Sequence, residues 1–223
     1  TNVADRKSRQ MLHKARKMNP DAVVVATGCY VQARGEDIDP CVDIVVGNNK
    51  KKDLIQILDG FYEKKQGQNK AVIDINHTHE YEEMHLNKTA EHTRAYIKVQ
   101  DGCNQFCTYC IIPKLRGKFR SVPMERLIAQ AEDMAEQGVK ELILVAQETT
   151  VYGKDLYGKK SLHILLKKLC EIRGIRWIRI LYCYPEEIYD ELIETIRDEK
   201  KICHYLDIPI QHASDRILKR MGR

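Results

Sequence analysis

The fold is decided by residues 95–110, which read AYIKVQDGCNQFCTYC. Residues 95–99 are predicted to form a strand, and residues 101–121 a loop that follows it. Cys103, Cys107 and Cys110, three of the eight cysteines of the chain, lie within this loop. In α/β folds the loops at the carboxyl ends of strands are where catalytic groups are placed. The stretch therefore predicts a chemical site directly after a strand.

Strands and helices alternate on the carboxyl side of this loop. Pro123 and Gly138 mark the start and stop of one helix. From this helix onward the predicted elements are helix 123–137, strand 141–146, loop 147–160, helix 161–172, strand 177–181, helix 186–197, strand 205–208 and a helix from Ser214. Four βα units result, which predicts an α/β fold and, for residues 94–223, a partial (β/α) barrel, open or closed.

Residues 1–65 form a separate α/β segment in this interpretation. It holds a helix over 3–18, strands over 22–26 and 43–46, and a helix over 50–64. Residues 66–93 are polar and show no sustained period, so we expect a linker there. The linker holds four of the eight histidines, His77, His79, His85 and His92. We interpret them as solvated rather than as metal ligands, because no Cys or carboxylate spacing completes a site.

The composition is that of an ordinary globular protein. Of 223 residues, 43% are hydrophobic and 31% charged, and the net charge is +5. No apolar run approaches the roughly 20 residues of a membrane span, so we expect no membrane partner. The mildly basic balance is compatible with an RNA or ribosomal partner. The start at Thr1 shows no secretory signal pattern, and because helical segments run close to both ends we expect a fragment of a longer, cytoplasmic protein.

The cysteine usage indicates one metal cluster in a reducing compartment. The thiols at Cys41, Cys170, Cys183 and Cys203 are interpreted as buried packing groups. The CxxxCxxC spacing of the other three favours a soft metal centre, since thiolates select Fe–S, Zn or Cu(I). Three ligands leave one iron of a cubic 4Fe–4S cluster open to a small molecule. The alternatives are a zinc site that borrows a fourth ligand such as His92, and a disulfide.

Several motifs resemble those of one enzyme family. Tyr109 stands before the last cysteine of CxxxCxxC, as in the radical S-adenosylmethionine (SAM) signature. The flanking residues 96–103, 111–113, 116–117 and 120–121, and residues 25–32 (VATGCYVQ), are similar to those of the methylthiotransferase branch. The resemblance covers nearly the whole chain.

The resemblance implies a cofactor set. Cys103, Cys107 and Cys110 would hold a 4Fe–4S cluster that binds the amino and carboxylate groups of SAM, and an electron donor protein would drive cleavage to a 5′-deoxyadenosyl radical. Cys29 matches the third ligand of a second, auxiliary 4Fe–4S cluster in a partial N-terminal domain, whose other two cysteines would precede Thr1.

The resemblance also implies further contacts around the first cluster. Tyr109 would lie near the adenine, and Gln147 and Glu148 would contact the methionine part. Arg116 and Arg120 would pair with cofactor or substrate anions, with structural ion pairs as the alternative. The pair Gln211 and His212 would face the same site, with a structural histidine as the alternative.

The two halves resemble different subgroups. Residues 4–32 are similar to the enzymes that act on threonylcarbamoyladenosine in tRNA, whereas residues 144–158, 177–185 and 205–212 are similar to those that methylthiolate an aspartate β-carbon of a small-subunit ribosomal protein. Because the barrel carries the catalysis, we expect the ribosomal protein as substrate and keep the tRNA as the alternative. A non-catalytic metal- or RNA-binding fragment is a more remote one. The basic residues of helix 3–18 are interpreted as a solvated face rather than an RNA contact.

Overall fold

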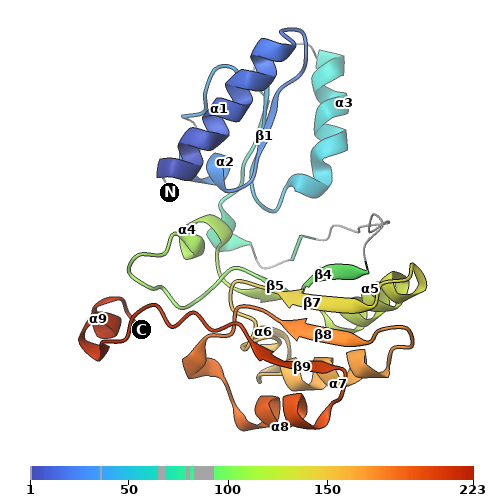
Figure 1. Ribbon diagram of the computed structural model, residues 1–223. Coiled ribbons are helices and arrows are strands. Elements are labelled where there is room, and N and C mark those ends of the chain that lie inside the picture. Colours follow the sequence, from blue (N-terminus) through green and yellow to red (C-terminus); the bar gives the residue numbers. More distant parts are fainter. Residues whose placement is uncertain (1, 36, 65–68, 79–80, 83–92) are drawn as a thin grey trace. The chain divides into compact units, whose positions relative to one another are not determined.

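The computed structural model describes residues 2–35, 37–64, 69–78, 81–82 and 93–223 (Figure 1). The chain divides into two units. The first comprises Thr1–Met84 together with Lys114–Gly117, and the second comprises His85–Pro113 together with Lys118–Arg223. In the described part of the chain, no helix has the length and apolar character needed to cross a bilayer.

The first unit is built on a three-stranded parallel sheet. Its strands are β1 (Val25–Thr27), β2 (Ile44–Val46) and β3 (Asn69–Ala71), in that order. Figure 1 shows β1 between α1 (Asn2–Met18) and α3 (Leu54–Lys64). Strand β2 is central and wholly buried, which explains its unbroken apolar sequence. Cys41 packs against the core that includes Val24, Val31 and Val45.

Three elements of this unit escaped the sequence analysis. Strand β3 and the 3-10 turn Ile75–His77 lie within the segment expected to be a linker. Asn69–Ala71 has no apolar run of its own, and its pairing with β2 makes it a strand. The six-residue helix α2 (Cys29–Arg34) is too short to show a period. His77 is exposed and lies 2.8 Å from Asp74, whereas His79, His85 and His92 lie outside the described residues.

The second unit contains a four-stranded parallel sheet, which confirms the α/β prediction. Its order is β4 (Arg94–Lys98), β7 (Glu141–Val145), β8 (Trp177–Ile180) and β9 (Ile202–Leu206). Helices α5 (Met124–Glu136), α7 (Leu162–Glu171) and α8 (Asp190–Asp198) connect successive strands. The apolar positions of α7 point into the core: Leu162, Leu165, Leu166 and Leu169 are fully buried. The predicted βα alternation is therefore present, although β9 begins three residues earlier than expected.

Shorter elements surround the ends of this sheet. The antiparallel ribbon of β5 (Gln100–Asp101) and β6 (Arg120–Ser121) flanks the cysteine loop. The remaining short helices are α4 (Ile112–Arg116), α6 (Lys154–Tyr157), the 3-10 turn Pro185–Glu187 and α9 (Asp215–Arg220). Helix α4 begins in the second unit and ends in the segment Lys114–Gly117 of the first, so it continues directly from the cysteine loop into the other unit.

Candidate functional site

The three clustered cysteines lie on the loop that follows β4 and β5. Val99 N donates to Val145 O at 3.0 Å, so the chain remains fixed to the sheet as it enters the loop. Cys110 N donates to Cys107 O at 2.9 Å, which forms a tight turn between the last two cysteines. Cys107 is buried, whereas Cys103 and Cys110 are partly exposed, and all three are free thiols. The loop thus presents three thiols from a fixed strand end.

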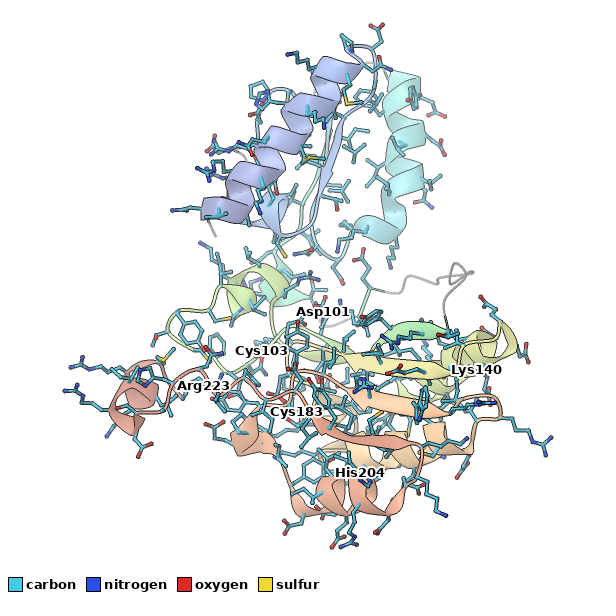
Figure 2. The ribbon with its side chains drawn as sticks, in the orientation of Figure 1. Asp101, Cys103, Lys140, Cys183, His204 and Arg223 are labelled. Atoms are coloured by element: carbon cyan, nitrogen blue, oxygen red, sulfur yellow. The ribbon has the colours of Figure 1, made fainter. Side chains whose placement is uncertain are left out.

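Backbone with positive φ occurs after the carboxyl ends of several strands. The four non-glycine residues with positive φ in the described part of the chain are Asn49, Phe106, Tyr182 and Gln211. Each follows a strand: β2, β5, β8 and β9 respectively. A non-glycine residue with positive φ costs conformational free energy, and such residues cluster at binding and catalytic sites. Figure 2 shows Cys103, Cys183 and Arg223 toward one end of the second sheet, and Lys140, which precedes β7, toward the other.

The three thiols of the loop lie near enough to one another to interact electrostatically. Electrostatic interaction with Cys107 and Cys110 raises the pKa of Cys103, although burial is the larger cause. In the described residues, His13, Asp39 and Cys41 are the one group of three whose ligand atoms all lie within 4.8 Å of one another. A lone zinc ion, with Zn–S of about 2.3 Å, would hold its thiolates about 3.8 Å apart. The three loop cysteines are therefore near enough to interact, although their sulfur atoms are not all within 4.8 Å of one another.

Gln147 and Glu148 follow β7 and reach the cysteine loop. Gln147 Oε1 accepts a hydrogen bond of 2.9 Å from Gly102 N, next to Cys103. Glu148 is 3% exposed. Burial raises the pKa of its carboxyl group, and Glu148 in turn raises the pKa of Cys103. The structure therefore brings both predicted residues to the site.

Glu148 also fastens two loops together. Its Oε1 accepts hydrogen bonds from Thr150 N at 2.9 Å, from Thr150 Oγ1, and from Tyr184 N at 3.4 Å. Thr150 is on the loop after β7, and Tyr184 on the loop after β8. These three donors converge on Oε1, and among the described residues none donates to Oε2, so this second oxygen remains for another donor.

A cationic side chain beside the loop was not predicted from the sequence. Thr108 N donates to Met221 O at 3.0 Å. The guanidinium of Arg223 lies 3.9 Å from the ring centroid of Tyr184, and a hydrogen bond joins Arg223 to Tyr109. Tyr109 itself is 51% exposed. No local spacing links residue 223 to residue 109, so only the tertiary structure could reveal this contact.

The two predicted arginines, Arg116 and Arg120, make different contacts from Gln147 and Glu148. Arg120 Nη1 donates to Lys118 O at 3.0 Å, and its Nη2 lies 3.9 Å from Asp101 Oδ2. The side chain is only 5% exposed, which favours the structural alternative. Arg116 ends α4 and belongs to the first unit. The structure therefore favours the structural role for Arg120, and the anion contact of Arg116 stays a prediction.

Other candidates have local structural roles. His212 Nδ1 accepts from Ser214 N at 2.9 Å, next to the start of α9, which favours the structural histidine. Burial raises the pKa of Cys183 to about 12 and that of Cys170 to about 11. Both thiols are therefore protonated at neutral pH, as expected for packing groups.

Cys29 begins α2, directly after β1, in the first unit. Asn48 Nδ2 lies 3.8 Å from Cys29 Sγ and donates to Leu115 O at 2.8 Å. Asn48 is 1% exposed, and its Oδ1 has no hydrogen-bond partner among the described residues. The sequence analysis missed Asn48, although the Gly47-Asn48-Asn49 turn after β2 could have indicated a side chain at the same sheet edge as Cys29.

Known proteins similar to this chain agree with the site. A ribosomal protein uS12 methylthiotransferase RimO from Clostridium botulinum (strain Eklund 17B / Type B) is 52% identical over 205 residues, which cover 90% of this chain and 45% of the relative. Its counterpart from Lachnoclostridium phytofermentans is 53% identical over 203 residues, covering 90% and 46%. This chain therefore spans about half the length of these relatives.

The fold has a counterpart among solved structures. The cobalamin-dependent S-adenosylmethionine radical enzyme OxsB superposes with a TM-score of 0.50 at 12% identity, over 96% of this chain and 39% of that enzyme. The family model of the radical SAM superfamily matches residues 97–223, which include β7, β8, β9 and all three loop cysteines. The chain thus belongs to the radical SAM superfamily.

Proposed function

We propose that this chain is part of a methylthiotransferase that adds a methylthio group to an aspartate β-carbon of ribosomal protein uS12. The observation that carries the proposal is the identity of about half with two RimO enzymes over 90% of the chain. Because the match covers 90%, it includes residues of the N-terminal half as well as of the barrel. This extent favours the ribosomal protein over the tRNA, despite the resemblance of residues 4–32 to the tRNA subgroup.

The three loop cysteines are the proposed ligands of a 4Fe–4S cluster. Their place in one loop and their electrostatic interaction with one another fit a group that all three bind. Cys29 is the proposed ligand of a second cluster, and the buried unpaired Oδ1 of Asn48 beside it fits an incomplete site. When bound, the first cluster supplies the electron that cleaves SAM reductively to methionine and a 5′-deoxyadenosyl radical.

The chain's own residues would position the cofactor. Gln147 holds Gly102 N and so fixes the loop beside Cys103. The free carboxylate oxygen of Glu148 would accept a hydrogen bond from the SAM amino group, a contact that the charge of the carboxylate strengthens in a buried place. Tyr109, half exposed and held by Arg223, would pack near the adenine. In this proposal residues 94–223 form the radical SAM barrel, and residues 1–65 part of the auxiliary-cluster domain.

The reaction also needs partners that the chain does not contain. We propose an electron donor protein and a cytoplasmic location, because a reducing compartment keeps eight cysteines as free thiols. Arg116 stays a proposed anion contact.

Mass spectrometry of two possible substrates tests the proposal. The full-length protein with reconstituted clusters is incubated separately with uS12 and with threonylcarbamoyladenosine-containing tRNA. We expect uS12 to gain the methylthio group, and Cys107→Ala to abolish the gain while Cys170→Ala leaves it nearly unchanged. A methylthio group on the tRNA alone would overturn the choice of substrate, and retained SAM cleavage in Cys107→Ala would overturn the ligand assignment.

A further inference from the structure

A hollow of about 480 Å³ runs along helix α1 in the first unit. Its lining residues are all charged or polar, although the aliphatic stems of their long side chains form much of its surface. The lining residues are Arg6, Arg9, Gln10, His13, Lys14, Lys17 and Asp39, and we refer to them as the basic groove. All but Asp39 lie on α1.

The helix places these residues on one face. Arg6, Gln10, His13 and Lys17 follow one another at spacings of four, three and four, so they line up along the helix. With a rise of 1.5 Å per residue, Arg6 to Lys17 covers about 16 Å. The positive charge is therefore an ordered stripe rather than a uniformly charged surface.

The acids of this region are already engaged. Asp39 Oδ2 lies 2.7 Å from His13 Nε2, and its Oδ1 accepts from Cys41 N at 3.1 Å. Asp5 pairs with Arg34 at 3.2 Å. Across the residues that the structure describes, Arg6, Arg9, Lys14 and Lys17 have no carboxylate within ion-pair distance.

A neighbouring arginine shows what a structural cation looks like on the same helix. Arg16 donates to Cys41 O at 3.0 Å and to Ala22 O at 2.8 Å, and pairs with Asp43. It closes the helix onto the sheet, and it is not part of the groove. The four groove cations lack such partners, so the fold does not require their charge.

The sequence alone favoured a solvated face for these residues; from the hollow and from cations that lack carboxylate partners among the described residues we infer instead that the basic groove binds the phosphate backbone of RNA. Lys and Arg supply the sequence-independent affinity for nucleic acid, and the stripe is long enough to meet several phosphates. The groove side chains end in charged or polar groups, which favours a polyanion over an apolar peptide. Val3, Met11 and Met18 of the same helix are exposed apolar residues, so binding to anionic vesicles is the competing outcome of the test. The choice of RNA among polyanions rests on the proposed function, because a ribosomal protein substrate is found with RNA.

The inference predicts how RNA binding depends on salt. Each phosphate neutralised on a single strand contributes about 0.7 to the slope of log affinity against log salt. Replacing the four groove cations by Gln should lower the slope by about 3. A control variant loses the same number of charges from exposed lysines elsewhere: Lys52, Lys159, Lys167 and Lys200. It should keep a slope close to that of the unchanged protein.

The assay is fluorescence anisotropy with a labelled single-stranded RNA of about 20 nucleotides, long enough for several phosphate contacts. Circular dichroism confirms that each variant is folded. Asp39→Asn adds a test with the opposite sign: it removes the one negative charge of the groove but keeps an acceptor for Cys41 N, so RNA affinity should rise. Equal slopes in the groove and control variants, lower affinity in Asp39→Asn, or tighter binding to anionic phosphatidylglycerol vesicles than to RNA would overturn the inference.

The result of the RNA-binding test can be told apart from the result of the test of the proposed function. If isolated uS12 is modified but the groove variant binds RNA as well as the unchanged protein, only this inference fails. If uS12 is not modified while RNA binding depends on the groove as described, the inference about the groove stands and the proposed substrate fails.

Discussion

Two variants of Glu148 separate its contribution to stability from its proposed contribution to cofactor binding. In Glu148→Ala, the backbone amides of Thr150 and Tyr184 lose their acceptor within a buried region. Each buried donor left without a partner costs about 1–3 kcal/mol, so the two together predict a loss of about 2–6 kcal/mol in the free energy of unfolding. In Glu148→Gln the amide oxygen can replace Oε1, and the stability should change by less than about 1 kcal/mol.

The same pair of variants tests the cofactor contact. A hydrogen bond to a charged group contributes about 1.5–3 kcal/mol and a neutral one about 0.5–1.5 kcal/mol. Loss of the charge in Glu148→Gln should therefore weaken SAM binding by about 1–2 kcal/mol, or about 5- to 30-fold. Urea denaturation followed by circular dichroism measures the first quantity, and calorimetric titration of the reconstituted protein with SAM the second. A fully stable Glu148→Ala would refute the hydrogen-bond argument, and unchanged SAM affinity in Glu148→Gln would refute the contact.

Three further results follow from the buried groups. Burial raises the pKa of Cys183 from its ordinary 9.0 to about 12 in the folded chain, so stability should fall as pH rises above 9, by about 1.4 kcal/mol at pH 10 relative to Cys183→Ala. Parallel pH curves for the two proteins would contradict this. Asn48→Ala leaves Leu115 O without its donor and should destabilise by about 1–3 kcal/mol in urea denaturation, and an unchanged midpoint would count against that hydrogen bond. Cys170 has a pKa of about 11, so iodoacetamide at pH 8 should modify it only after denaturation, and rapid labelling of the native chain would show that it is not a packing thiol.

The parallel sheet of the second unit could be predicted because its strands are long and bounded by helices with clear periods. Leu162, Leu165, Leu166 and Leu169 show the helical spacing that the core requires. The strand β3 could not, because Asn69–Ala71 is polar and becomes a strand only by pairing with β2. Local pattern thus predicts elements that form their own core contacts, and it misses those defined by a neighbour.

The candidate site shows the same division. The spacing of Cys103, Cys107 and Cys110 indicated their chemistry directly, since ligands of one centre lie within a single loop. The contact of Arg223 with Tyr184 joins residues from distant loops and left no trace in the sequence. For Arg120 the sequence left an anion contact and a structural ion pair open, and the structure favours the ion pair, because the side chain is 5% exposed and lies 3.9 Å from Asp101.

Electron paramagnetic resonance of the reduced, anaerobically reconstituted protein tests the central claim most directly. If three thiolates hold a 4Fe–4S cluster with one iron free of protein ligands, the reduced protein should show a cluster signal that changes when SAM is added. Cys107→Ala should lose this signal. A protein that takes up zinc in place of iron, or a cluster signal that SAM leaves unchanged, would contradict the account.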